Sequence, residues 1–220
     1  MDLLIDTADI HAWHDLMPTG LFTGITTNPL LAARAGLSYP DIDWGDMARR
    51  AADLGATMLH GQVHGPVESY VDWAGAFYEA GRNAGIQTVV KVPLSEPGIR
   101  AVQGIKALRG PILMTAAYDA KQMFIATALG ADYVAPYFGR MLERGLPAYE
   151  VLAQMLAIGR SAGGGTRILV ASLRDTAQMA QLAQEGHDCF TIAPEVAREL
   201  LTDANTLAAV AEFEAAASGR

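Results

Sequence analysis

Short apolar segments alternate with longer segments of helical periodicity along the whole chain. The short segments are apolar at consecutive positions, which is typical of strands buried on both faces of a sheet. The longer segments carry apolar residues three or four positions apart, as one face of a helix does. Eight segments fit the strand pattern: 3–6, 22–27, 57–63, 88–93, 112–116, 133–137, 168–172 and 190–194. The alternation therefore predicts eight βα units.

Eight strands joined by helical crossovers match a closed parallel barrel covered by helices. An open doubly wound sheet is the alternative. It is disfavoured because Asp6-Thr7-Ala8-Asp9 follows the first predicted strand, where such folds often carry a Gly-x-Gly-x-x-Gly turn. We therefore expect residues 1–220 to form one domain of the α/β class, a single (β/α)₈ TIM barrel.

Composition and charge narrow the function classes. With 220 residues, of which 51% are hydrophobic, the chain can bury one sizeable core. The net charge of −8 disfavours nucleic acid or an anionic membrane as a partner, so a phosphate ligand requires a local arginine. Cys189 is the only cysteine, and the first residues lack a secretion signal. We expect a cytoplasmic protein without membrane spans.

Lys91 lies inside the apolar segment Thr88-Val89-Val90-Lys91-Val92-Pro93. Burial of an unpaired ammonium lowers the lysine pKa, and a neutral amine attacks ketones and aldehydes. The position therefore favours Schiff-base chemistry. The alternative is a structural lysine whose stem is buried while its amine reaches water.

Polar residues close most of the predicted strands. In a TIM barrel these strand ends meet at one mouth, where active sites lie. The residues are Asp6, Thr26, Thr27, Asn28, Gln62, Lys91, Thr115, Tyr137 and Ser172. Each has a structural alternative, such as helix capping by Asp6 or Asn28. Together they favour a carbohydrate-like substrate.

The motifs at these strand ends resemble those of the transaldolase family, in particular its fructose-6-phosphate aldolase branch. The resemblance runs from Asp2 to about Phe213. It is carried by Asp6, Gly24-Ile25-Thr26-Thr27-Asn28-Pro29, Val90-Lys91-Val92-Pro93, Thr115-Ala116 with Tyr118, Val134-Ala135-Pro136-Tyr137 with Arg140, and Ala171-Ser172. The family fold is a (β/α)₈ barrel. Its Schiff-base lysine corresponds to Lys91.

The resemblance also implies roles for other residues. Transaldolases carry a glutamate on the third strand, whereas fructose-6-phosphate aldolases carry a glutamine and rely on a tyrosine. Gln62 and Tyr137 therefore favour the aldolase, with Thr115 helping to hold a water. Asp6 and Asn28, with Thr26, are expected at the donor hydroxyls. Arg140, Ser172 and Arg174 are expected at the acceptor phosphate.

The resemblance implies an aldolase that acts on ketose phosphates, dihydroxyacetone or hydroxyacetone, and an aldehyde such as glyceraldehyde 3-phosphate. It requires no metal or organic cofactor, because the lysine activates the ketone. A transaldolase that transfers a dihydroxyacetone unit between sugar phosphates is the alternative, and a non-catalytic sugar-phosphate-binding barrel is a third interpretation.

The chain departs from the family at Leu30, Met114 and Phe138, which we expect to add bulk near the pocket. A C-terminal helix is expected at about 205–217. In the family this helix packs on a neighbouring subunit in a ring of ten chains, although the tail here is short. A homo-oligomer, pentamer or decamer, is the corresponding expectation.

Overall fold

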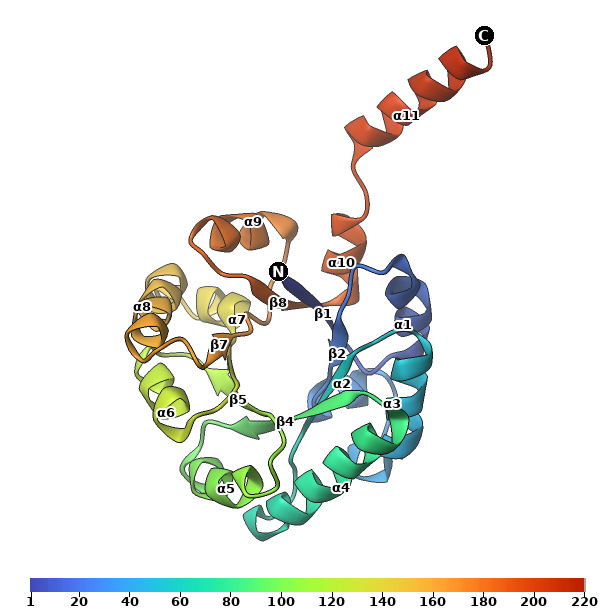
Figure 1. Cartoon of the computed structure of the whole chain (residues 1–220). Coiled ribbons are helices and arrows are strands. Elements are labelled where there is room, and N and C mark those ends of the chain that lie inside the picture. Colours follow the sequence, from blue (N-terminus) through green and yellow to red (C-terminus); the bar gives the residue numbers. More distant parts are fainter. Residues whose placement is uncertain (220) are drawn as a thin grey trace.

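The computed structural model describes residues 1–219 and shows eight parallel strands arranged around one axis (Figure 1). The strands are β1 (Asp2–Asp6), β2 (Gly24–Thr26), β3 (Met58–Gln62), β4 (Gln87–Pro93), β5 (Ile112–Ala117), β6 (Tyr133–Pro136), β7 (Arg167–Ile168) and β8 (Cys189–Ile192). Each strand from β1 to β6 pairs in parallel with the next strand along the chain, and β1 also pairs in parallel with β8.

The barrel closes between β7 and β8 through the residues that follow β7. Val170 bridges Phe190, its amide donates to the Cys189 carbonyl at 2.9 Å, and the Thr191 amide donates to the Val170 carbonyl at 2.9 Å. The prediction of a (β/α)₈ barrel is therefore confirmed, although its seventh strand is only two residues long and the closure between the β7 and β8 segments is one isolated bridge.

Helices follow the strands and form the outer ring in Figure 1. The helices of residues 1–219 are α1 (Ile10–Leu16), α2 (Pro29–Arg34), α3 (Trp44–Asp53), α4 (Tyr70–Ala84), α5 (Glu96–Lys106), α6 (Lys121–Leu129), α7 (Phe138–Glu143), α8 (Ala148–Ser161), α9 (Thr176–Gln184), α10 (Pro194–Leu200) and α11 (Ala204–Ala217), of which α11 lies outside this ring. Short 3₁₀ turns lie at Met17–Thr19, Tyr39–Asp41 and Val67–Ser69. No helix within residues 1–219 is long and apolar enough to cross a bilayer.

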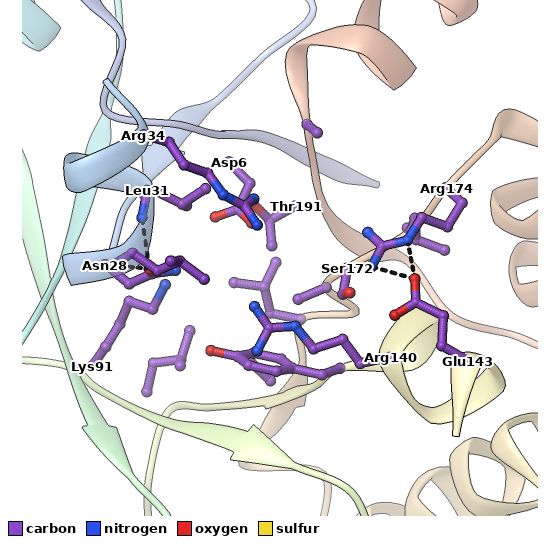
Figure 2. A pocket seen from close by; sticks show the side chains of 18 residues that line it. Asp6, Asn28, Leu31, Arg34, Lys91, Arg140, Glu143, Ser172, Arg174 and Thr191 are labelled. Carbon is purple, nitrogen blue, oxygen red and sulfur yellow. Dashed lines mark hydrogen bonds and ion pairs between the residues drawn. The ribbon is translucent and has the colours of Figure 1, made fainter. Parts of the chain in front are cut away.

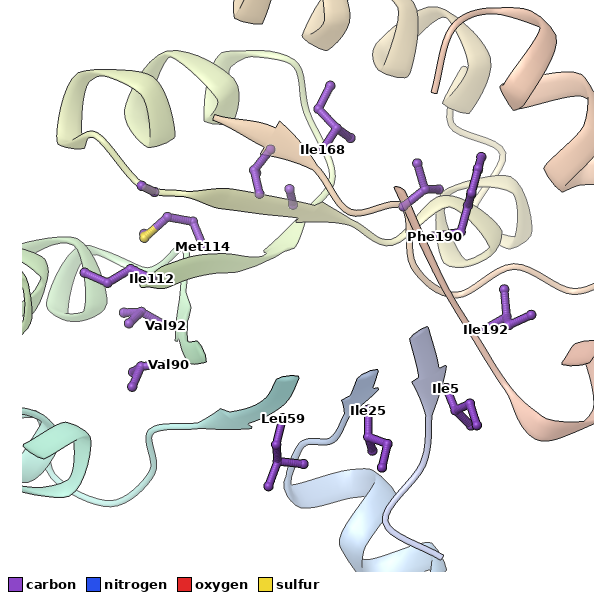
Figure 3. Close-up of a cluster of buried hydrophobic side chains, with 14 of the residues drawn as sticks. Ile5, Ile25, Leu59, Val90, Val92, Ile112, Met114, Ile168, Phe190 and Ile192 are labelled. Carbon is purple, nitrogen blue, oxygen red and sulfur yellow. The ribbon is translucent and has the colours of Figure 1, made fainter. Parts of the chain in front are cut away.

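Alternate strand residues build two separate cores. Ile5, Ile25, Leu59, Val90 and Val92 belong to the larger one, which packs between strands and helices (Figure 3). The smaller core fills the barrel. It consists of Leu4, Val89, Leu113, Ala135, Leu169, Ala171 and Cys189. The inward positions beyond this inner core, at the C-terminal strand ends, are therefore left to build a site.

Two of the three departures from the family have side chains that point away from the cavity at the barrel mouth. Met114 is fully buried in the outer core, and Phe138 is fully buried with its ring 4.8 Å from that of Tyr149. Only Leu30 lines the cavity described below. The expectation that all three add bulk to the pocket is therefore wrong for Met114 and Phe138, because both side chains point toward the helices.

The last helix, α11, extends away from the barrel (Figure 1) and has no buried residue. Its side chains Leu207, Val210 and Phe213 are 64%, 46% and 68% exposed. These positions are three residues apart, so the side chains lie along one side of the helix. The barrel therefore carries an apolar helix face that its own residues leave uncovered.

Candidate active site

A cavity of about 400 Å³ opens at the C-terminal ends of the strands (Figure 2). It is lined by Asp6, Asn28, Leu30, Leu31, Arg34, Lys91, Leu113, Ala135, Tyr137, Arg140, Glu143, Leu169, Ala171, Ser172, Leu173, Arg174, Thr191 and Ala193. The side chains come from both halves of the barrel, which are far apart in sequence. This is the position expected for the active site of the fold.

Lys91 is the buried amine of the cavity. It is 4% exposed, and its strand register places it between Gln62 on β3 and Leu113 on β5. Its Nζ atom makes no hydrogen bond or ion pair within the described chain. Burial lowers the pKa of Lys91, and the Asp6 carboxylate opposes this shift. The arrangement favours a neutral, nucleophilic amine.

Asp6 ends β1 and is held by a short chain of hydroxyl groups. Thr26 donates to Asp6 Oδ1 at 2.6 Å, and the hydroxyls of Thr26 and Thr191 are 2.5 Å apart. Thr26 and Thr191 are buried, and Thr191 lines the cavity while Thr26 lies behind it. One carboxylate oxygen of Asp6 is thus occupied by the protein.

Asn28 begins α2 and is fixed by its role as helix cap. Its Oδ1 accepts hydrogen bonds from the amides of Leu30 at 2.9 Å and Leu31 at 3.0 Å, and Pro29 supplies the favoured first helical residue. Since the amide oxygen is used in capping, the NH₂ group is what remains for a ligand. In Figure 2 the Asn28 side chain lies near the amine of Lys91.

Tyr137 faces the cavity after β6. Its hydroxyl is 3.1 Å from Thr115 Oγ1, and the Arg140 guanidinium carbon lies 4.8 Å from its ring centroid. The ring also contacts Tyr118 edge to face at a centroid distance of 5.7 Å. Burial raises the pKa of Tyr137, and the hydrogen bond between Tyr137 and Thr115 opposes this shift only in part. The resting side chain is therefore a neutral phenol that can donate a proton.

Ser172, Arg140 and Arg174 form the opposite wall, which carries positive charge. Ser172 has a left-handed backbone at φ 66°, and its buried Oγ has no hydrogen-bond partner in the described residues. Arg174 pairs with Glu143 at 2.7 Å. An unpartnered hydroxyl flanked by two guanidinium groups is suited to phosphate oxygens.

Close backbone approach at Gly139 holds this wall together. The Gly139 amide donates to the Ser172 carbonyl at 3.0 Å, and a Cβ at Gly139 would lie 2.0 Å from that oxygen. Only glycine allows this contact. The first turn of α7, which carries Arg140, is thereby fixed against Ser172.

Seven of the predicted site residues line the cavity, and the other three do not. Those that line it are Asp6, Asn28, Lys91, Tyr137, Arg140, Ser172 and Arg174. Thr26 and Thr115 contact it indirectly through Asp6 and Tyr137. Gln62 lies beside Lys91 in register, and its backbone bonds to the Tyr39 hydroxyl.

The sequence did not identify Arg34, Glu143 and Thr191 as pocket residues. In Figure 2 the Arg34 guanidinium lies on the Asp6 side of the cavity, and within residues 1–219 it forms no ion pair. Nothing in its helical segment distinguished it from a solvated arginine. For Thr191 a signal existed, since a hydroxyl residue stands between Phe190 and Ile192 in an otherwise apolar strand.

Comparison with known proteins agrees with this geometry. Residues 3–218 match the model of the family described as transaldolase/fructose-6-phosphate aldolase. The chain belongs to this family. A probable transaldolase of Phenylobacterium zucineum is 32% identical over 91% of this chain and 88% of the relative. One of Anaeromyxobacter sp. is 31% identical over 97% of both chains.

Solved structures share the fold with more distant sequences. Mandelate oxidase with (S)-2-phenylpropionate has a TM-score of 0.63 at 12% identity, over 90% of this chain and 65% of that one. The same enzyme with benzoyl-formic acid has a TM-score of 0.61 at 14% identity, over 90% of this chain and 65% of that one. This chain thus spans about two thirds of the length of those structures, and the likeness concerns the barrel alone. The sequence relatives identify an enzyme of the aldolase or transaldolase type.

Proposed function

We propose that the protein is a Schiff-base aldolase that cleaves or forms ketose phosphates of the fructose 6-phosphate type. The observation that carries the proposal is Lys91, a buried amine without a partner among the described residues, in the main cavity of a transaldolase-family barrel. A buried amine with a lowered pKa is the nucleophile that this chemistry requires.

The reaction begins when the neutral Nζ of Lys91 attacks the ketone carbon of the substrate. The resulting carbinolamine loses its oxygen as water and becomes an iminium ion. A base then removes the proton of the hydroxyl on the carbon beyond the bond to be cleaved. That bond breaks, its electron pair moves into the iminium to give an enamine, and an aldehyde leaves. Protonation of the enamine and hydrolysis return dihydroxyacetone and free Lys91.

Tyr137 is the proposed acid and base. As a neutral phenol it supplies the proton with which the carbinolamine oxygen leaves as water. The phenolate so formed is stabilised by the positive iminium and can take the hydroxyl proton in the cleavage step. Thr115, 3.1 Å from the phenol oxygen, orients it. Gln62, beside Lys91 in register, can orient a water but cannot take a proton from it.

The two walls are assigned to the two ends of the substrate. Asp6 and Asn28 bind the donor hydroxyl, the first as an acceptor and the second through its free NH₂ group. Arg140, Ser172 and Arg174 bind the acceptor phosphate. Such a division leaves the ketone carbon near Lys91 and the aldehyde near Tyr137.

A transaldolase is the second candidate, because the sequence relatives carry that name. It would use the same Lys91 but pass the enamine to a second sugar aldehyde without releasing dihydroxyacetone. Gln62 favours the aldolase, since the resemblance places a glutamate there in transaldolases.

Borohydride trapping tests the proposal. The protein is incubated separately with fructose 6-phosphate and with dihydroxyacetone, reduced, and read by intact mass and peptide mapping, with Lys91→Met as control. We expect an adduct on Lys91 from both compounds. An adduct from fructose 6-phosphate alone would favour the transaldolase. Absence of any adduct in folded protein would contradict both assignments.

A further inference from the structure

We propose that Thr191 is a donor-specificity residue. Thr191 orients Asp6 through Thr26. Together, Thr191 and Asp6 present hydrogen-bond acceptors to the cavity, which select ketones with a hydroxyl group next to the carbonyl. The inference rests on the proposed aldolase function and deepens it, because it states that Thr191 helps to recognise the hydroxyl group of the donor.

The three residues form one continuous hydrogen-bonded chain across adjacent strands. Thr191 on β8 and Thr26 on β2 flank β1, the strand that Asp6 ends. The Thr191 and Thr26 hydroxyls are 2.5 Å apart, and the Thr26 hydroxyl is 2.6 Å from Asp6 Oδ1. Thr26 and Thr191 are 0% and 2% exposed, so bulk water does not compete for these bonds.

The direction of each hydrogen bond in the chain follows from counting protons. The Asp6 carboxylate can only accept, so the single proton of the Thr26 hydroxyl is directed to Asp6. The Thr26 oxygen then has no proton for Thr191. Thr191 must therefore donate its own proton to Thr26. Both hydroxyl protons are directed along the chain.

The surface that remains toward the cavity consists of acceptors. Thr191 and Asp6 both line the cavity, and they offer an oxygen lone pair and a carboxylate oxygen. Asn28 on the same side has its oxygen occupied by the α2 cap and can offer only its NH₂ group. A hydroxyl fits both demands, since it donates to the acceptor wall and accepts from Asn28. A methyl group meets neither of them.

Thr191→Val removes the hydroxyl while keeping the shape of the side chain, and Thr191→Ser is the matched control that restores it. The kcat/KM of each variant is measured with dihydroxyacetone and with acetone, using one common aldehyde acceptor. We expect Thr191→Val to lower kcat/KM by roughly 10- to 100-fold for dihydroxyacetone and by less than about 3-fold for acetone. Thr191→Ser should stay within about 3-fold of the wild type for both donors.

Thermal unfolding of each variant and Lys91 adduct formation separate the possible failures. Equal losses with both donors, or no loss with either, would show that Thr191 has no part in reading the donor. If adducts with dihydroxyacetone still form on Lys91 in that case, the aldolase assignment stands and only this inference falls. If wild-type protein forms no Lys91 adduct with any of the ketones, both proposals are wrong.

Discussion

At the scale of single residues, the site depends on the opposition between burial and charge at Lys91. Burial favours the neutral amine, whereas Asp6 on the neighbouring wall favours the ammonium. Burial is the larger of the two influences, so the pKa of Lys91 is lowered overall. In the proposed mechanism Asp6 therefore has two effects: it binds the donor hydroxyl and it influences the pKa of the Lys91 amine.

Asp6→Asn tests this opposition through pH dependence. Removing the carboxylate removes the influence that raises the pKa of Lys91, so the pKa of this amine falls further. Since only the neutral amine attacks, the acid limb of the pH profile for adduct formation on Lys91 should move to lower pH. Dihydroxyacetone affinity should fall by about 10-fold, because a charged hydrogen bond is lost.

Asp72→Asn on the exposed face of α4 removes the same charge away from the cavity and serves as the control. An acid limb that stays in place in Asp6→Asn, or that moves equally in Asp72→Asn, would show that Asp6 does not influence the amine.

Single residues also mark how far sequence reasoning reaches. Lys91 and Tyr137 were predicted because each sits in a sequence context that a structural role explains poorly or that resembles a known motif. Arg34 was not predicted as a pocket residue. Its segment is rich in alanine and gives no sign that the arginine lines a cavity once α2 is packed on the barrel. The placement of Gln62 outside the cavity lining depends on side-chain direction, which a pattern of residue types does not contain.

At the scale of elements, most strands were predicted because their apolar positions are continuous. The predicted 168–172 strand was the least accurate, since β7 covers only Arg167–Ile168. Backbone hydrogen bonds to the β6 segment nevertheless continue at Leu169 and Ala171, and the segment ends at Ser172, which has a left-handed backbone and accepts a hydrogen bond from the Gly139 amide of α7. The spacing of hydrophobic residues along the sequence does not predict a contact between segments as distant as Gly139 and Ser172. The irregular end of β7 builds the positively charged wall.

Gly139→Ala tests the importance of this approach. Its Cβ would lie 2.0 Å from the Ser172 carbonyl oxygen, so α7 and Ser172 must move apart. We expect unfolding free energy to fall by about 1–3 kcal/mol, and KM for a phosphorylated aldehyde to rise about 10-fold with little change for a non-phosphorylated one. Steady-state kinetics and thermal unfolding measure both effects.

Gly75→Ala in α4 is the matched control, since its new methyl group would lie at an ordinary 3.9 Å from Leu108 Cδ1. It should leave KM unchanged and stabilise the helix by about 0.5–1 kcal/mol. If the ratio of KM values for the phosphorylated and the non-phosphorylated aldehyde is the same in wild type and Gly139→Ala, Ser172 and Arg140 do not bind the acceptor phosphate.

At the scale of the whole molecule, α11 is the element that the barrel does not account for. A helix of 14 residues with three exposed apolar side chains and no buried residue gains little stability from packing on its own chain. We propose that a second copy of this chain covers the face formed by Leu207, Val210 and Phe213, as the family resemblance suggests.

Phe213→Asp should therefore reduce the mass of the assembly measured by light scattering after size-exclusion chromatography. Asn205→Asp adds the same charge at the start of α11 and should leave the mass unchanged. A monomeric wild type, or an unchanged mass in Phe213→Asp, would contradict the proposal. The cavity that holds Lys91 is lined by residues of a single barrel, so Lys91 adducts should still form in Phe213→Asp.

The position of the single cysteine has a consequence for following the barrel in time. Cys189 is 1% exposed inside the barrel, burial raises the pKa of its thiol to about 12, and its strand β8, the last of the barrel, pairs with the first strand β1. A thiol reagent should therefore modify the native protein only when β8 and β1 come apart. The labelling rate at Cys189 in the wild-type protein therefore measures how often β8 and β1 separate. A donor bound between Asp6 and Thr191 should slow this labelling.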